Sequence, residues 1–166
     1  MIINKIDLFD KETGVFCTPV FDFFLEYEIK RSFRYQAFAT LVMLQPDRKV
    51  SHIESIGELV KVLKRNIRET DIIGRLNGYK FGIILIGADL DGAWIMAKRV
   101  LEHVNNYEFL KEPDKKLPVS IGGACFPTNS VEKNELMLMA EKMLKMAQKR
   151  GGNIICFPHL TEKIED

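Results

Sequence analysis

The chain has 166 residues, of which 46% are apolar and 28% are charged, a composition typical of a single folded domain. Its 24 basic and 23 acidic side chains leave a net charge of +1, which argues against binding nucleic acid through an overall positive charge. The longest apolar runs are too short to cross a bilayer, and no signal-like apolar stretch opens the chain. Three scattered cysteines without metal-ligand spacing predict free thiols in a reducing compartment, so we expect a cytoplasmic protein with no metal centre.

Helical and strand patterns alternate along the chain. From Ile53 to Ile67 the apolar residues recur at helical spacing, which predicts a helix with one stripe facing the core. Asn77-Gly78, a favoured two-residue turn, lies between two apolar runs and predicts a β-hairpin. The same kinds of pattern predict the other elements. We expect helices at 20–34, 53–67, 89–106 and 132–150, and strands at 38–44, 72–76, 81–86, 117–125 and 153–157.

The order α-β-α-β-β-α-β-α-β predicts an α/β (α+β) fold with a mixed sheet of about five strands flanked by helices. Residues 1–158 form one domain in this interpretation, and the polar residues 159–166 form a C-terminal tail. One face of the last helix is apolar and should enter the core. Met137, Met139, Met143 and Met146 in that helix are either core filler or, for some of them, a surface for a partner.

Four short motifs follow one another between residues 10 and 157. They are Asp10-Lys11-Glu12-Thr13-Gly14-Val15, the run from Arg68 to Leu76, Val119-Ser120-Ile121-Gly122-Gly123-Ala124, and the segment from Ala140 to Asn153. In this order they resemble the D-x-L-T-G-L, R-x-x-D-x-x-x-R-[YL], V-S-I-G-V-A and A-D-x-A-L-Y-x-A-K-x-x-G-R-N segments of GGDEF domains, the diguanylate cyclase family. The resemblance implies a cyclase/polymerase-palm-like fold, which agrees with the predicted element order.

The catalytic positions that the resemblance implies carry other residues. A diguanylate cyclase holds magnesium on carboxylates, but the signature G-G-[DE]-E-F reads Asn77-Gly78-Tyr79-Lys80-Phe81, which places an ammonium group where a metal ligand belongs. The segment expected to carry the D-x-D carboxylates reads Met43-Leu44-Gln45-Pro46. The guanine-binding loop is shortened to residues 47–52, and Gln148 and Gly152 stand at the triphosphate-binding Lys and Arg positions. We therefore expect no cyclase activity and no magnesium cofactor.

The motif R-x-x-D, here Arg68 and Asp71, is retained. In the family it forms a product-binding inhibitory site, so the resemblance implies cyclic di-GMP as a ligand. A guanidinium can pair with a phosphate or with the O6/N7 edge of guanine, and a carboxylate can accept guanine N–H groups. The i, i+3 spacing near a helix end is expected to bring the two side chains together. A basic stripe formed by Lys61, Lys64 and Arg65 could support the site by attracting an anionic ligand.

Structural explanations exist for each of these residues. Arg68 would favour the helix dipole, Asp71 would cap a turn, and the basic stripe would be a solvated face. Arg75 is expected to pair with an acidic neighbour, and Tyr79 and Lys80 are expected to be exposed turn residues.

Two functions stay open at this point: a cyclic di-GMP-binding regulatory domain that signals through protein contacts, or a ligand-free interaction or scaffolding domain. Neither function involves nucleic acid or a membrane, and the sequence leaves the protein partner and the oligomeric state open.

Overall fold

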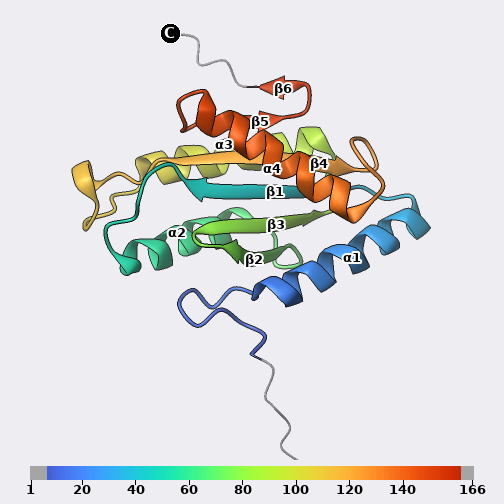
Figure 1. The fold of residues 1–166 in the computed structure, drawn as a ribbon, viewed down its shortest axis with the longest axis horizontal. Coiled ribbons are helices and arrows are strands. Elements are labelled where there is room, and N and C mark those ends of the chain that lie inside the picture. The colour runs from blue at the N-terminus through green and yellow to red at the C-terminus, as the bar shows by residue number, and fades with distance from the viewer. Residues whose placement is uncertain (1–6, 162–166) are drawn as a thin grey trace, which may run out of the picture.

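The computed structural model describes residues 7–161, which form a mixed sheet covered by helices on both faces. The strand order is β2-β3-β1-β4-β5-β6, running from bottom to top in Figure 1. All neighbouring strands are antiparallel except β4 and β5, which are parallel. The helices are α1 (Thr18–Tyr35), α2 (Ile53–Asn66), α3 (Leu90–Asn106) and α4 (Lys133–Lys149), with a short 3₁₀ turn η1 (Pro113–Lys115). The strands are β1 (Ala39–Pro46), β2 (Ile72–Asn77), β3 (Lys80–Ile86), β4 (Val119–Phe126), β5 (Ile155–Phe157) and β6 (Leu160–Thr161).

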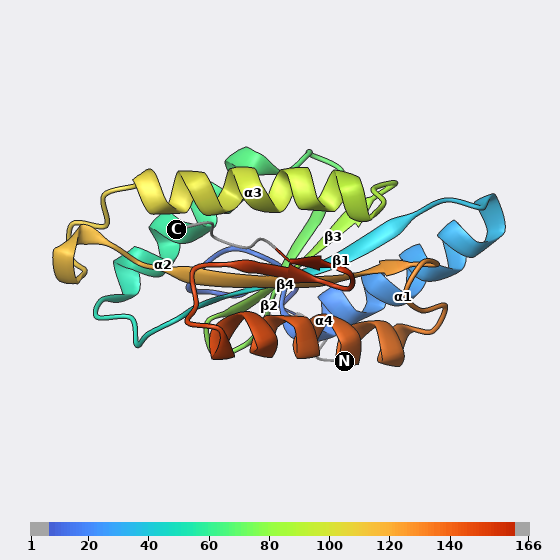
Figure 2. The same ribbon diagram turned by 90° about the horizontal axis from the view of Figure 1, so that it is seen from above.

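Helices α2 and α3 cover one face of the sheet, and α1 and α4 cover the other (Figure 2). Strand β1 lies in the middle, so its side chains alternate between two cores. Val42 and Leu44 pack under α2 and α3, whereas Leu41 and Met43 pack under α1 and α4. A strand buried on both faces needs a continuous apolar run, which explains why 39–44 lacks polar residues other than Thr40. The predicted mixed sheet flanked by helices is confirmed.

The predicted hairpin is present as β2 and β3, but its turn is one residue further along the chain. Asn77 pairs with Lys80, so Gly78 and Tyr79 form the two-residue turn, and Gly78 adopts the left-handed conformation with φ 54°. A bulge between Arg75 and Asn77 shifts the register of β2 at this end. The glycine therefore still determines the turn, although Asn77 belongs to the strand.

Three further details differ from the prediction. Strand β1 continues through Gln45 to Pro46, because these residues keep pairing with Ser120 and Val119 of β4. Ile53, the first residue of α2, is 45% exposed and lies outside the core stripe. Within the segment predicted as a tail, Leu160–Thr161 pairs with β5, and residues 162–166 lie outside the described part of the chain. Among residues 7–161, no helix is long and apolar enough to span a bilayer.

Helix α4 approaches β4 closely at Gly122. A methyl group on Gly122 would overlap the backbone nitrogen of Leu144 and lie 2.6 Å from its Cα atom. Because backbone atoms cannot rotate away, we expect Gly122→Ala to lower the free energy of unfolding by about 3 kcal/mol or more. Gly57→Ala is the matched control, since a methyl group in that helix has no neighbour within 4 Å and should stabilise α2 by roughly 0.5–1 kcal/mol. Urea unfolding of both variants tests this, and similar effects at the two positions would contradict the packing described.

Candidate functional site

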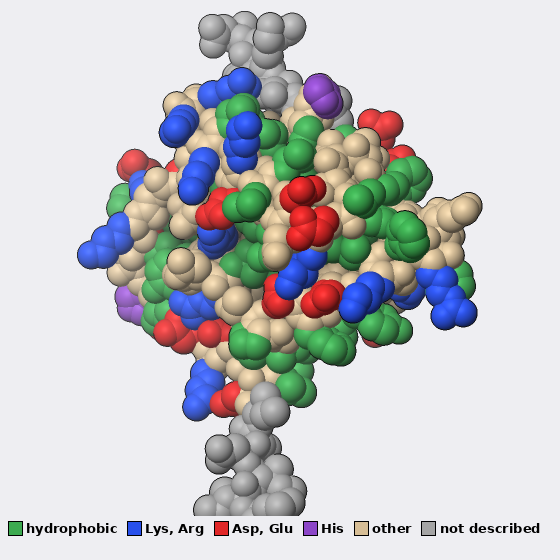
Figure 3. Space-filling view, turned by 45° about the vertical axis from the view of Figure 1, so that its right-hand side comes forward, with side chains coloured by type: hydrophobic (Ala, Val, Ile, Leu, Met, Phe, Trp, Pro, Cys, Tyr) green, Lys and Arg blue, Asp and Glu red, His purple; other side chains and the backbone are tan. Residues whose placement is uncertain are grey.

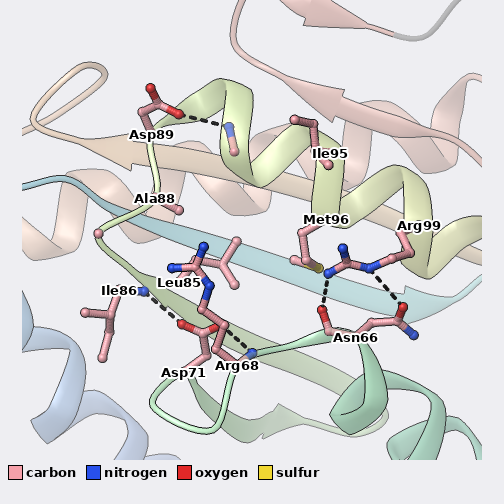
Figure 4. A pocket seen from close by; sticks show the side chains of 12 residues that line it. Asn66, Arg68, Asp71, Leu85, Ile86, Ala88, Asp89, Ile95, Met96 and Arg99 are labelled. Atoms are coloured by element: carbon pink, nitrogen blue, oxygen red, sulfur yellow. Dashed lines mark hydrogen bonds between the residues drawn. The ribbon is translucent and has the colours of Figure 1, made fainter.

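A cavity of about 390 Å³ lies between the end of α2, the turn before β2 and the first half of α3. Its polar and charged lining includes Arg68 and Asp71 from the turn and Arg99 from α3 (Figure 4). Leu85, Ile95 and Met96 contribute apolar surface. The cavity therefore combines charged groups from two separate elements with apolar side chains, the usual character of a small-molecule site.

Asp71 organises the turn with its carboxylate. The backbone N–H of Arg68 donates to Asp71 Oδ2 at 2.9 Å, and the N–H of Ile86 donates to Oδ1 at 3.1 Å. The N–H of Asp71 in turn donates to the carbonyl of Arg68 at 3.0 Å. These bonds tie the entrance of β2 to the end of β3, so Asp71 has a structural role whether or not it also contacts a ligand.

The Arg68 side chain is exposed and projects into the space between the Asp71 turn and α3 (Figure 4). Its guanidinium has no hydrogen-bond or ion-pair partner within residues 7–161. Helix α2 ends at Asn66, so a turn rather than helical spacing brings Arg68 near Asp71. The expectation that the pair lies on a helix end is wrong in this respect, because the extended backbone of Ile67 ends the helix.

Arg99 is the cavity residue that sequence reasoning missed. Its Nε donates to Asn66 Oδ1 at 3.2 Å and its Nη2 to the Asn66 carbonyl at 2.6 Å, which holds the guanidinium beside the end of α2. Asn66 is 3% exposed and provides a rigid support. In the sequence, the only signal is that Arg99 follows Ile95 and Met96 at helical spacing, which places the three on neighbouring positions of α3.

The predicted supporting basic residues lie elsewhere. Lys61, Lys64 and Arg65 are exposed on α2, and none of them is among the described side chains that line the cavity. Because α2 ends at Asn66, Arg68 does not continue their helical stripe. Among the described residues, Arg99 of α3 is the basic side chain that lines the cavity together with Arg68.

Tyr79 and Lys80 of the signature segment were expected to be exposed turn residues, but both are half-buried. Lys80 Nζ lies 3.0 Å from Glu141 Oε1 of α4, and the Lys80 side chain is only 17% exposed. The hydrogen bond from Lys80 lowers the pKa of Glu141, although burial works in the opposite direction. Tyr79 is half-buried against the core under α2 and α3, and Phe81 is fully buried. The contact with Glu141 of α4 explains the burial of Lys80, and packing against the core under α2 and α3 explains that of Tyr79, whereas Asn77 and Gly78 remain exposed.

Arg75 pairs with acidic neighbours, as predicted. Its Nη1 lies 3.1 Å from Asp10 Oδ2 and 2.9 Å from Glu12 Oε2, and its guanidinium lies 5.2 Å from the centre of the Tyr79 ring. Burial tends to raise the pKa of Asp10, but hydrogen bonds from Thr13 and Arg75 outweigh it and lower the pKa. The segment around Asp10 therefore fastens the N-terminal part of the domain to the hairpin.

Gln45 and Gln148, which the resemblance places at catalytic positions, pair with each other, and Asp47 nearby in the chain has its own partners. Gln148 donates to Gln45 Oε1 at 3.1 Å. The Asp47 carboxylate accepts from the Ser120 hydroxyl at 2.5 Å and from the backbone N–H of Asn153 at 2.7 Å. Between residues 7 and 161 no three His, Cys, Asp or Glu side chains gather in a group that could hold a metal ion. With an ammonium at residue 80 and amides at 45 and 148, these side chains do not fit a divalent cation.

Comparison with known proteins identifies the family. Residues 54–154, more than half of the chain, match the family model "Diguanylate cyclase, GGDEF domain". The chain is 33% identical over 109 residues to the protein YhcK of Bacillus subtilis, and 27% identical over 157 residues to the probable diguanylate cyclase DgcC of Escherichia coli K12. These matches cover 64% and 87% of this chain but only 30% and 41% of the two relatives.

The fold agrees with this match. A crystal structure of the GGDEF domain of DgcB from Caulobacter crescentus, in complex with c-di-GMP, superimposes with a TM-score of 0.83 at 16% identity. The superposition covers 94% of this chain and 98% of that domain. The chain belongs to the GGDEF domain family.

The Lys80–Glu141 pair is expected to stabilise the fold in a pH-dependent way. Since the pKa of Glu141 is lowered below its ordinary value of 4.5, the stabilisation is present above that value and is lost as the pH falls through the pKa in the folded protein. A double-mutant cycle with Lys80→Gln and Glu141→Gln should give a coupling of about 0.2–1 kcal/mol at pH 7 that disappears in acid.

Lys145 provides the control for this cycle. It lies 3.9 Å from the same Glu141 oxygen and is 66% exposed, so Lys145→Gln should couple to Glu141→Gln more weakly than Lys80→Gln does. A coupling that persists unchanged below the Glu141 pKa would show that the pair acts through packing rather than charge.

Proposed function

We propose that this chain is a catalytically inactive GGDEF domain that binds cyclic di-GMP through Arg68 and Arg99 and signals through protein contacts. One observation carries the proposal: two guanidiniums from separate elements line one cavity, and that of Arg68 has no partner within the described residues. The carboxylates of Asp71 and Asp89 also line the cavity but accept backbone N–H groups, whereas a guanidinium without such a partner can pair with a phosphate of a cyclic dinucleotide.

The size and chemistry of the cavity support this ligand. Its volume of about 390 Å³ lies in the range of small-molecule sites. Arginine can bind a phosphate or the O6/N7 edge of guanine with two hydrogen bonds, and the side chains of Ile95 and Met96 offer apolar surface to a base. The c-di-GMP complex of the DgcB GGDEF domain supports this choice among dinucleotides.

The lack of cyclase activity is the second part of the proposal. Lys80 and Glu141 neutralise each other, Gln45 pairs with Gln148, and Asp47 is held by Ser120 and Asn153. A diguanylate cyclase has to bind magnesium and polarise a triphosphate, and none of these groups is suited to that task. We therefore assign the family's catalytic end of the domain a structural role.

A ligand-free scaffolding domain is the second candidate, and one observation favours it. Both carboxylate oxygens of Asp71 already accept backbone N–H groups, and Arg99 already donates to Asn66. The R-x-x-D motif then serves the turn and the junction of α2 with α3 without any ligand. A titration decides between the two candidates.

Calorimetric titration of cyclic di-GMP is expected to show binding to the wild-type protein. Losing a charge-assisted contact costs about 1.5–3 kcal/mol, so Arg68→Ala and Arg99→Ala should each weaken binding roughly ten- to a hundredfold. Arg68→Ala is the cleaner variant because Arg99 also supports Asn66. Lys61→Ala, an exposed cation on α2 outside the cavity, is the matched control and should bind like the wild type.

Absence of binding in the same titration would favour the scaffolding function. No heat at about 100 μM ligand would limit any binding free energy to weaker than about −5.5 kcal/mol. An equal loss in Lys61→Ala would point to general charge attraction and against the proposed site. Thermal melts of each variant separate lost binding from lost folding.

The cyclase assay is the other test. Purified protein incubated with GTP and magnesium or manganese is expected to form no cyclic di-GMP above a no-protein blank, because Lys80, paired with Glu141, offers no ligand for the cation that the reaction needs. Chromatographic detection of product that scales with protein concentration would overturn the inactive assignment. A GGDEF protein with an intact signature, run in parallel, verifies the assay.

A further inference from the structure

An apolar groove runs along the outer side of α4. It has a volume of about 560 Å³, and its apolar lining comes from the second half of β5 and its turn and from one side of α4: Leu138, Met139, Met143, Met146, Phe157 and Pro158. A second hollow of about 380 Å³ shares Leu138, Lys142 and Met146 with it and continues to Lys149. We call the two together the α4 groove. Helix α4, which provides most of this lining, covers the face of the sheet opposite α2 and α3, which flank the Arg68 cavity (Figure 2).

Leu138 is the clearest sign that the groove is not part of the core. Its side chain is 67% exposed, whereas Leu136 and Leu144 of the same helix are buried. Met139 and Met146 are half-buried at the edge of the inner clusters. Methionine side chains adapt to the shape of a partner, so an exposed leucine among half-buried methionines is a surface suited to docking a helix.

Charge on the rim of the groove indicates the kind of partner. Lys142, Lys145 and Lys149 follow one another along α4 and are all exposed. Glu141 is already bound to Lys80 and lies 3.9 Å from Lys145, while Lys142 and Lys149 have no partner within residues 7–161. Glu135 accepts a hydrogen bond from the Ser130 hydroxyl at the other end. On the side of the molecule drawn in Figure 3, basic, acidic and hydrophobic side chains are mixed.

We propose that the α4 groove docks an acidic amphipathic helix of a partner protein. Apolar residues of that helix at i, i+3, i+4 and i+7 would enter the groove beside Leu138 and the methionines, and acidic residues on its flank would meet Lys142 and Lys149. A second copy of this chain suits the groove less well, because two such faces would bring their lysines together. The proposal is independent of cyclic di-GMP binding, since the two sites lie on opposite faces of the sheet.

The experiment uses two synthetic fluorescein-labelled peptides with identical leucines at i, i+3, i+4 and i+7. One carries glutamates at the flanking positions and the other carries lysines. Fluorescence anisotropy should show that the acidic peptide binds the full chain with a Kd near or below about 100 μM and that the basic peptide binds at least tenfold more weakly. Binding of the acidic peptide should weaken as salt rises.

Substitutions locate the binding surface. Leu138→Ser and the double variant Lys142→Glu with Lys149→Glu should each weaken binding of the acidic peptide at least tenfold. Leu110→Ser and Lys30→Glu are the matched controls and should bind like the wild type. Leu110 is 68% exposed and Lys30 is 76% exposed, and both lie outside the groove. Because all five residues are exposed, thermal melts should be unchanged.

Three results would overturn the proposal. They are no binding of the acidic peptide up to about 1 mM, equal binding of both peptides, or a concentration-dependent dimer in sedimentation that Leu138→Ser abolishes. The last result would assign the groove to a second copy. None of these outcomes depends on cyclic di-GMP, so failure here leaves the Arg68 cavity untouched, and failure of the calorimetric titration leaves this proposal untouched.

Discussion

The central position of β1 is the constraint on which the rest of the domain depends. It pairs with β3 on one side and β4 on the other, and its side chains enter both cores. A strand in this place cannot carry unpaired polar groups, so polar chemistry is limited to its end, at Gln45 and Asp47. The other polar side chains near the end of β1 come from the neighbouring hairpin and from α4.

The polar residues at the end of β1 and on the neighbouring elements satisfy one another. Lys80 is only 17% exposed, which would be unfavourable for a lone ammonium group, and Glu141 of α4 compensates its charge. Gln45 and Gln148 satisfy each other in the same way. The polar groups at this end join the hairpin and β1 to α4.

The two faces of the sheet offer different chemistry. On the side of α2 and α3, Arg68 and Arg99 line a cavity with Asp71 and Asp89, and its geometry rests on Asp71 and Asn66. On the side of α1 and α4, Leu138 and the methionines form an apolar groove with a basic rim. Because the sheet between them is rigid and fully packed, a ligand on one side and a protein on the other could bind at the same time.

The sequence by itself determined the order of the elements, the mixed sheet, the hairpin and the family. These properties follow from local periodicity, turn chemistry and short motifs, which are all features of neighbouring residues. It also drew attention to Arg68 and Asp71, which line one cavity, and it predicted the pairing of Arg75 with acidic residues.

Only the tertiary structure decided which distant residues meet. It placed Arg99 and Arg68 on the lining of one cavity and left Lys61, Lys64 and Arg65 outside it. It also brought the half-buried Lys80 against Glu141. It also ended α2 before Arg68 and left Leu138 exposed. The physical reason is that periodicity reports how a side chain points from its own helix or strand. What that side chain then meets depends on how elements far apart in the chain pack together.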